Sequence, residues 1–136
     1  MSRRTARKHA FSLVYQLEFY TDIEPDKILN EYGKDHELTD GDREFIYQEI
    51  SGVIQNINKI DIYITENLKG WKMGRLNTVD IAILRLAIYE ILFAEDIPYS
   101  VSVNEAVELA KIYSSEEAPA FINGVLGSVV KSVGEV

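Results

Sequence analysis

The stretch that decides the fold covers residues 77–98 and reads NTVDIAILRLAIYEILFAEDIP. Apolar residues between Val79 and Phe93 occur on nearly every side of a helix, and a helix that is apolar all round is buried. Asn77 is a suitable N-cap, and Asp80 places a carboxylate in the first turn. Fifteen helical residues rise only about 22 Å, and charged residues interrupt the run. We therefore expect a central helix of a globular protein and no membrane span.

Length and composition predict one domain over residues 1–136. The chain is 46% hydrophobic and 26% charged, which is typical of a globular protein with its own core. It contains no cysteine, which excludes disulfides and thiolate metal sites. The first residues carry positive charge but no apolar signal segment, so we expect a cytoplasmic protein.

The charge of the chain is divided unevenly. The net charge is −8, yet the first ten residues carry Arg3, Arg4, Arg7 and Lys8 and no acid, and the remainder carries −12. The spacing i,i+4 gathers these four cations on one side of a helix. Cations at a helix N-terminus oppose the helix dipole, so an external polyanion would explain them better than local stability. The alternative is a basic tail on a surface helix.

Apolar spacing predicts an all-α protein of about seven helices and no strands. The expected helices span residues 3–20, 25–32, 40–55, 58–68, 79–93, 100–113 and 118–133. Thr39 with Asp42 predicts a capping pair for the third helix, and Ser102 with Glu105 predicts a capping box for the sixth. Asn56 falls where one long apolar stripe can break into two helices.

Several residues inside these helices are expected to serve the fold. Arg85 and Glu90 lie on the central helix, where an unpaired charge is costly, so we expect both to be ion-paired. Gly124 and Gly127 resemble the GXXG loop of an RNA-binding domain, but they lie in an apolar helical stripe without strands. Close helix packing is the expected reason for these two glycines.

No catalytic or metal-binding constellation is present in the sequence. His9 and His36 are the only histidines, and neither belongs to a zinc or di-iron motif. There is no phosphate-binding loop, dinucleotide fingerprint or nucleophile elbow. The sequence predicts a protein that is not an enzyme and that has no cofactor or metal.

Four stretches in order resemble the NusB family of bacterial transcription antitermination factors. They are RRTARKHAFSLVYQ near the start, WKMGRL from Trp71, DIAILRLAIYEI with DIPYSVSVNEAVELAK after it, and FINGVL from Phe121. The resemblance covers essentially the whole chain. It implies two small helical bundles packed together, which we place at about residues 1–57 and 58–136.

The resemblance implies an RNA-binding role without catalysis. Family members bind the single-stranded boxA element of nascent ribosomal RNA together with NusE, a ribosomal protein, and join an antitermination complex on RNA polymerase. The residues that the resemblance and their charge assign to RNA are Arg3, Arg4, Arg7, Lys8, Lys72, Arg75, Glu117, Phe121 and Asn123. Phe121 would stack on a base and Asn123 would read a base edge. The alternative is that Phe121 belongs to the core and Asn123 caps or bridges helices, while Trp71 anchors its loop.

The family positions also assign Tyr15 and Asp80 to the interface with NusE. An equally good interpretation is that Asp80 is a first-turn carboxylate that stabilises the central helix. A second hypothesis for the whole chain is a helical protein–protein adaptor or self-associating bundle without RNA affinity. The sequence leaves open whether the protein is a monomer or a homodimer.

Overall fold

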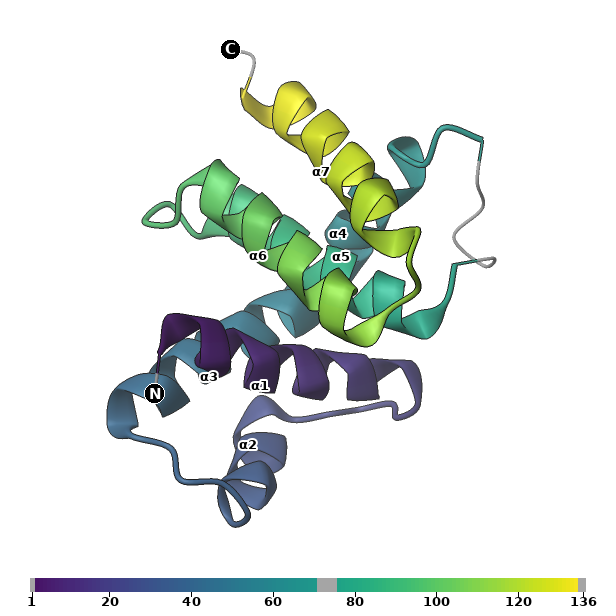
Figure 1. Cartoon of the computed structure of the whole chain (residues 1–136). Helices are drawn as coiled ribbons and strands as arrows, with labels where there is room; N and C mark the ends of the chain where they lie inside the picture. Colours follow the sequence, from purple (N-terminus) through teal and green to yellow (C-terminus); the bar gives the residue numbers. More distant parts are fainter. Residues whose placement is uncertain (1, 71–75, 135–136) are drawn as a thin grey trace.

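The computed structural model describes residues 2–70 and 76–134, and within them the chain is helical with no strand (Figure 1). The prediction of an all-α protein with seven α-helices is confirmed. The elements are α1 (Arg3–Tyr15), the 3₁₀ helix η1 (Gln16–Glu18), α2 (Pro25–Gly33), α3 (Asp40–Gln55), α4 (Ile57–Glu66), α5 (Thr78–Phe93), α6 (Tyr99–Tyr113) and α7 (Ala118–Gly134). None of the described helices is long and apolar enough to cross a bilayer.

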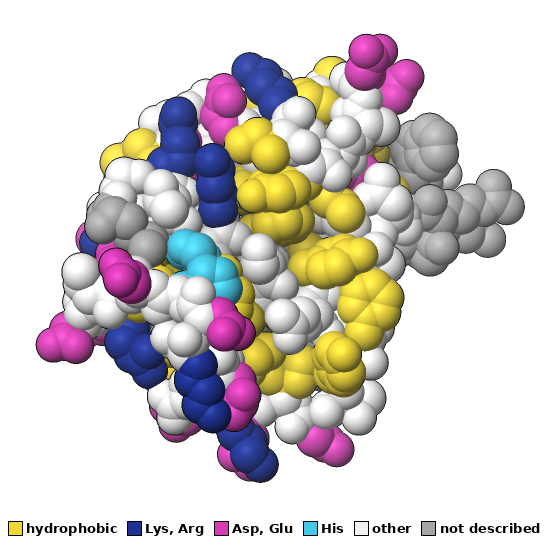
Figure 2. All heavy atoms as spheres, turned by 60° about the horizontal axis from the view of Figure 1, so that its bottom comes forward, with side chains coloured by type: hydrophobic (Ala, Val, Ile, Leu, Met, Phe, Trp, Pro, Cys, Tyr) yellow, Lys and Arg dark blue, Asp and Glu magenta, His cyan; other side chains and the backbone are white. Residues whose placement is uncertain are grey.

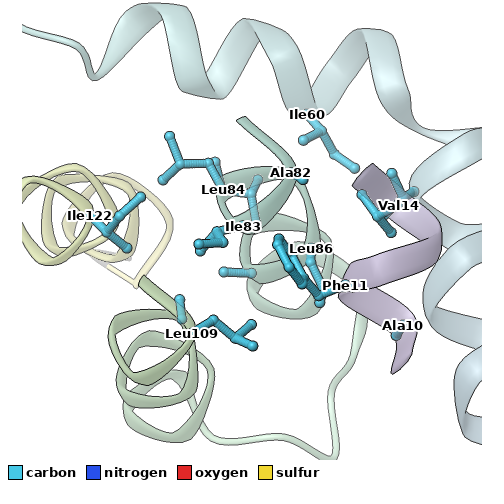
Figure 3. Packing of buried hydrophobic residues seen from close by; sticks show 14 of the residues in the cluster. Ala10, Phe11, Val14, Ile60, Ala82, Ile83, Leu84, Leu86, Leu109 and Ile122 are labelled. Carbon is cyan, nitrogen blue, oxygen red and sulfur yellow. The ribbon is translucent and has the colours of Figure 1, made fainter. Parts of the chain in front are cut away.

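The helix α5 is the hub of the molecule, as predicted. The Asn77 side chain accepts a hydrogen bond from the Asp80 backbone N–H at 2.7 Å and caps the helix. Ten residues of α5 are buried, and the helix contacts α1, α3, α4, α6 and α7. Figure 3 shows Ile83, Leu84 and Leu86 of this helix packing among side chains from the surrounding helices.

The N-terminal helices pack on one part of this hub. The helix α1 contacts α3 and α5, while α2 contacts α3 and lies at the edge of the molecule in Figure 1. Ala6, Ala10 and Val14 form a fully buried stripe on α1. The expected helix over 3–20 ends earlier, because after Tyr15 the chain tightens into η1.

The boundary between α3 and α4 was predicted at the right place. Thr39 and Asp42 form the expected capping box at the start of α3. Asn56 ends α3 with φ −117° and ψ 17°, which is outside helical geometry, and its side chain donates to the Gly52 carbonyl at 2.8 Å. This break allows one apolar stripe to serve two differently directed helices.

The capping box predicted from Ser102 and Glu105 is wrong. The helix α6 begins at Tyr99 after Pro98, so both residues lie inside the helix and are buried. Ser102 Oγ donates to Glu90 at 2.8 Å and Glu105 accepts from Arg4. Polar residues that looked like a local cap are therefore partners of charged residues on other helices.

The glycines of α7 also differ from the expectation. Gly124 and Gly127 are exposed, and a Cβ atom at either position would meet nothing within 4 Å among the described residues. Close packing against the described residues does not explain them. The glycine that packing does require is Gly52 on α3, where a Cβ would lie within 2.6 Å of three ring atoms of Tyr89.

Candidate nucleic-acid interface

Arg7 is enclosed in the interior rather than presented on the surface. The residue is 5% exposed, and its Nε and Nη2 atoms donate to the two oxygens of Glu90 at 2.9 and 3.1 Å. Ser102 donates to the same carboxylate, so the cluster joins α1, α5 and α6. The pKa of Arg7 is raised, because the Glu90 hydrogen bonds and charge outweigh a large opposing effect of burial.

This placement corrects the expectation that four cations share one exposed face. Arg7 follows the apolar side of α1 inward, because Glu90 on the hub supplies the charge that its burial requires. The ion pairs expected for the hub are confirmed for both residues. Glu90 pairs with Arg7, and Arg85 pairs with Asp61 at 2.9 Å and with Glu18.

Arg3 and Arg4 are the arginines that reach the surface. Arg4 donates to Glu105 through Nε and Nη2, the latter at 2.8 Å, yet its side chain remains 58% exposed. The guanidinium carbon of Arg3 lies 4.1 Å from the ring centroid of Phe45. Within the part of the chain that the structure describes, Arg3 has no carboxylate partner in an ion pair.

A groove of about 560 Å³ lies beside the start of α1. It is bounded by α1, α3, the end of α5 and the start of α6. Its charged lining residues are Arg3, Arg4, Arg7, Glu44, Glu49, Asp96 and Glu105. Because carboxylates outnumber arginines, this groove is not a uniformly cationic channel for phosphates.

Glu49 is the unusual member of this lining. It is 2% exposed, and its Oε1 atom has no hydrogen-bond partner among the described residues. Burial raises the pKa of Glu49, and the hydrogen bond to Glu90 and the charge of Glu90 raise it further. Burial would also raise the pKa of Glu90, but the hydrogen bonds from Glu49 and Arg7 hold it below its ordinary value. These opposite directions favour a proton on Glu49 and a charge on Glu90.

The coupled carboxyl pair predicts a specific pH dependence of stability. A raised pKa means that the folded state holds a proton on Glu49 that the unfolded state has lost, so Glu49 lowers stability as the pH rises above about 4.3. Glu49→Gln keeps an N–H donor for Glu90 and cannot ionise. We expect the stability of Glu49→Gln relative to the original protein to increase as the pH rises above about 4.3.

Urea unfolding of both proteins across this pH range measures the difference. His9 contributes in the opposite direction, because burial lowers its pKa, but it is present in both proteins and cancels. Parallel stability profiles would show that Glu49 does not hold the extra proton.

An aromatic strip runs along the second half of α1. Phe11 packs against Tyr113 at a ring-centroid distance of 5.0 Å, and Tyr15 packs against Phe19 at 5.2 Å. Phe19 and Tyr113 are 58% and 43% exposed. Figure 2 shows that hydrophobic side chains gather over a broad area of the face it views.

Asp80 lies close to this strip through its contact with α6. It is buried and accepts a hydrogen bond from Ser114 Oγ at 2.7 Å, and Ser114 follows Tyr113 directly in the chain. The structure therefore brings the two residues predicted for the NusE interface to one region. Asp80 also lies in the first turn of α5, in agreement with its interpretation as a carboxylate that stabilises the start of this helix.

None of the remaining predicted RNA residues that the structure describes lines the groove beside α1. Glu117 and Asn123 are exposed near the start of α7, and Phe121 is half-buried against the core. Lys8 is half-exposed on α1, while Trp71, Lys72 and Arg75 lie outside the described residues.

The sequence reasoning missed Phe45 and Glu49 as members of this region. The sequence did contain an indication for Glu49, because this residue lies three residues after Ile46 and four before Val53, on the apolar stripe of α3. A charged residue on a buried stripe needs a partner. Its partner on α5 could not be identified from α3 alone.

A helical body with a groove of mixed charge and an exposed aromatic strip is typical of a helical binding protein. Comparison with known proteins makes the class specific. The model of the NusB family matches residues 4–131, and the chain belongs to this family, which consists of transcription antitermination factors and not of enzymes.

Relatives at the sequence level cover nearly the whole chain. Transcription antitermination protein NusB of Acetivibrio thermocellus is 50% identical over 131 residues, which are 96% of this chain and 90% of the relative. The Clostridium novyi protein of the same name is 42% identical, covering 97% of this chain and all of the relative.

Solved structures agree with the fold. NusB of T. maritima superposes with a TM-score of 0.88 at 37% identity and covers 96% of this chain and 92% of the other. A NusB chain in a complex of NusB and NusE with dsRNA has a TM-score of 0.84 at 26% identity, with 96% of each chain covered.

Proposed function

We propose that this protein binds single-stranded boxA-type RNA of ribosomal RNA operons together with the ribosomal protein NusE, and thereby joins an antitermination complex on RNA polymerase that promotes rRNA synthesis. The observation that carries the proposal is the exposed pair Arg3 and Arg4 at the start of α1, on a chain that is otherwise acidic. Because a nascent bacterial transcript lies in the cytoplasm, the protein would act there.

Charge and position support the RNA contact. Arg3 and Arg4 present planar guanidinium groups, which suit phosphates and base faces, and Lys8 extends the positive surface along α1. The predicted contacts by Glu117, Phe121 and Asn123 would add a second region of contact at the start of α7. Lys72 and Arg75 remain predicted RNA contacts and lie outside the described residues. The structural neighbour in which NusB and NusE are in complex with dsRNA supports NusE and RNA as partners.

The aromatic strip supports the protein contact. Exposed Phe19 and Tyr113 continue the packed rings of Phe11 and Tyr15, and amphipathic aromatic side chains are enriched at protein interfaces. Asp80 beside Tyr113 adds an acidic group for a basic ribosomal protein. We assign this region to NusE, with Tyr15 and Asp80 as the contact residues.

The experiment is an RNA-binding titration with and without NusE. Arg3→Glu with Arg4→Glu is expected to weaken binding of a boxA-type RNA at least tenfold, because two phosphate contacts become repulsive. The log–log salt slope should fall by about 1.4, at roughly 0.7 per phosphate of a single strand. Fluorescence anisotropy at several salt concentrations measures both the affinity and the salt slope.

The matched control changes the same charge elsewhere. Lys27→Glu with Lys34→Glu alters two exposed lysines at α2, away from the groove, and should leave the affinity close to that of the original protein. An Arg3/Arg4 variant that binds as tightly as this control would contradict the proposed site. Absence of RNA affinity at low salt, even with NusE present, would favour the adaptor hypothesis instead.

A further inference from the structure

We propose that the groove beside the start of α1 receives a single unstacked guanine base, with Arg3 as the stacking surface and Glu49 as the hydrogen-bond acceptor that selects it. This inference rests on the proposed RNA-binding function and adds base specificity to it. It follows from three features of the groove.

The first feature is a prepared stacking surface. The Arg3 guanidinium lies over one face of Phe45, and Arg7 lies 5.5 Å from the same ring centroid. Phe45 is itself packed against the core, so the Arg3 plane rests on a fixed support. Bases in single-stranded RNA stack on guanidinium planes as well as on aromatic rings. Arg3 can therefore bind a base on the face that Phe45 does not cover.

The second feature is the unpartnered oxygen of Glu49. This carboxyl is 2% exposed and lines the groove, and its Oε1 atom has no hydrogen-bond partner among the described residues. Buried polar atoms without partners are rare in native proteins. The raised pKa of Glu49 and the lowered pKa of Glu90 favour a hydrogen bond from the Glu49 carboxyl to Glu90, and a carboxyl that donates its proton keeps acceptor capacity. A ligand with an N–H donor would supply the Glu49 carboxyl with a hydrogen-bond partner.

The third feature is the balance of charge, which disfavours an ion as the occupant. Phosphate would meet Glu44, Asp96 and Glu105, whereas a metal cation would meet the arginines. A neutral heterocycle with donors on one edge and acceptors on another satisfies both kinds of group.

Among the bases, guanine fits this description best. Its Watson–Crick edge presents a ring N–H beside an amino group, and both are donors suited to a carboxyl oxygen. Its O6 and N7 atoms are acceptors that pair well with arginine. Uracil offers one ring N–H, and adenine has no ring N–H on that edge.

The test uses four labelled RNA nonamers, with NusE present. One is all uridine, and three carry guanosine, inosine or adenosine at the central position. We expect the guanosine nonamer to bind about tenfold more tightly than the adenosine one, which corresponds to the lower part of the discrimination that good base contacts provide. Inosine lacks the amino group and should bind with intermediate affinity.

Two substitutions at one position test the acceptor. Glu49→Met is of similar length without the oxygen, and should bind all four nonamers with the affinity that the original protein shows for all-uridine RNA. Glu49→Gln keeps a carbonyl oxygen and should retain the preference for guanosine. Circular dichroism checks that both variants fold, and the inosine and adenosine substitutions test the groove without any change in the protein.

Arg3→Lys tests the stacking surface while conserving charge. It should weaken the guanosine nonamer severalfold more than the all-uridine nonamer, because lysine has no planar group to stack on.

The outcomes separate this inference from the proposed function. Equal binding of all four nonamers would overturn the guanine site and leave RNA binding intact, whereas no binding of any would contradict the proposed function as well. Retention of the guanosine preference by Glu49→Met would remove Glu49 from the site. If Glu49→Met instead weakened NusE binding without RNA, the groove would hold a basic side chain of the protein partner, and the inference would be wrong.

Discussion

Replacement of Arg7 by Met is expected to lower the free energy of unfolding by about 3–5 kcal/mol, the usual cost of removing one partner from a buried ion pair. Arg7 and Glu90 are 5% and 1% exposed and share two hydrogen bonds. Without Arg7, Glu90 keeps Ser102 and Glu49 as partners but has no bidentate cation beside it. Urea unfolding followed by circular dichroism measures the loss.

Two controls make the result specific to the buried pair. Arg4→Met removes an arginine of the same helix whose side chain is 58% exposed, and it should change stability by less than about 1 kcal/mol. The double variant Arg7→Met with Glu90→Gln removes both charges and should recover much of the loss. Equal effects of Arg7→Met and Arg4→Met would show that burial of Arg7 does not matter.

Replacement of Gly52 by Ala is expected to destabilise the protein by about 1–3 kcal/mol, as is usual for overpacking. The new Cβ atom would lie within 2.6 Å of three Tyr89 ring atoms, and the Tyr89 ring stacks on Phe93 at a centroid distance of 6.0 Å. Either the ring or the contact between α3 and α5 must shift. Thermal and urea unfolding both report the change.

Gly127→Ala is the matched control for Gly52→Ala. Both glycines lie inside helices, but a Cβ at Gly127 meets nothing within 4 Å among the described residues. Because alanine is a better helix former by about 1 kcal/mol, this substitution should stabilise the protein. Stabilisation by both substitutions would mean that Tyr89 moves aside at little cost.

Most of the fold could be predicted from the sequence because it depends on local patterns. The apolar spacing of α1, α3 and α5 and the caps at Thr39 and Asn77 involve residues that are neighbours along one helix, and these predictions are confirmed. The division into bundles at about residue 57 stays a prediction.

The wrong predictions share one physical cause: each depends on which residue, far away in the sequence, a side chain contacts in the fold. Ser102 and Glu105 have capping-box spacing, but hydrogen bonds to charged residues on other helices are available to them inside the fold. Gly124 and Gly127 have the spacing of a packing motif, yet no described helix covers them. Spacing shows what a residue can do locally and not which partner it meets.

The same limit applies to the candidate site. Clustering of cations at the start of α1 was evident from the sequence, but their division into a buried Arg7 and exposed Arg3 and Arg4 depends on carboxylates of α5 and α6. Glu49 became recognisable as a site residue only when its unpartnered oxygen and the groove were seen together. The assignment of Tyr15 and Asp80 to one region likewise required the contact between α1 and α6.

The distant partners of α1 have a consequence for synthesis of the chain. Arg7 and Arg4 are synthesised before their partners, because Glu90 and Glu105 follow them by 83 and 101 residues. The helix α1 therefore cannot make these ion pairs until α5 and α6 have emerged from the ribosome. We expect co-translational folding to begin elsewhere and α1 to dock only after α5 and α6 have formed.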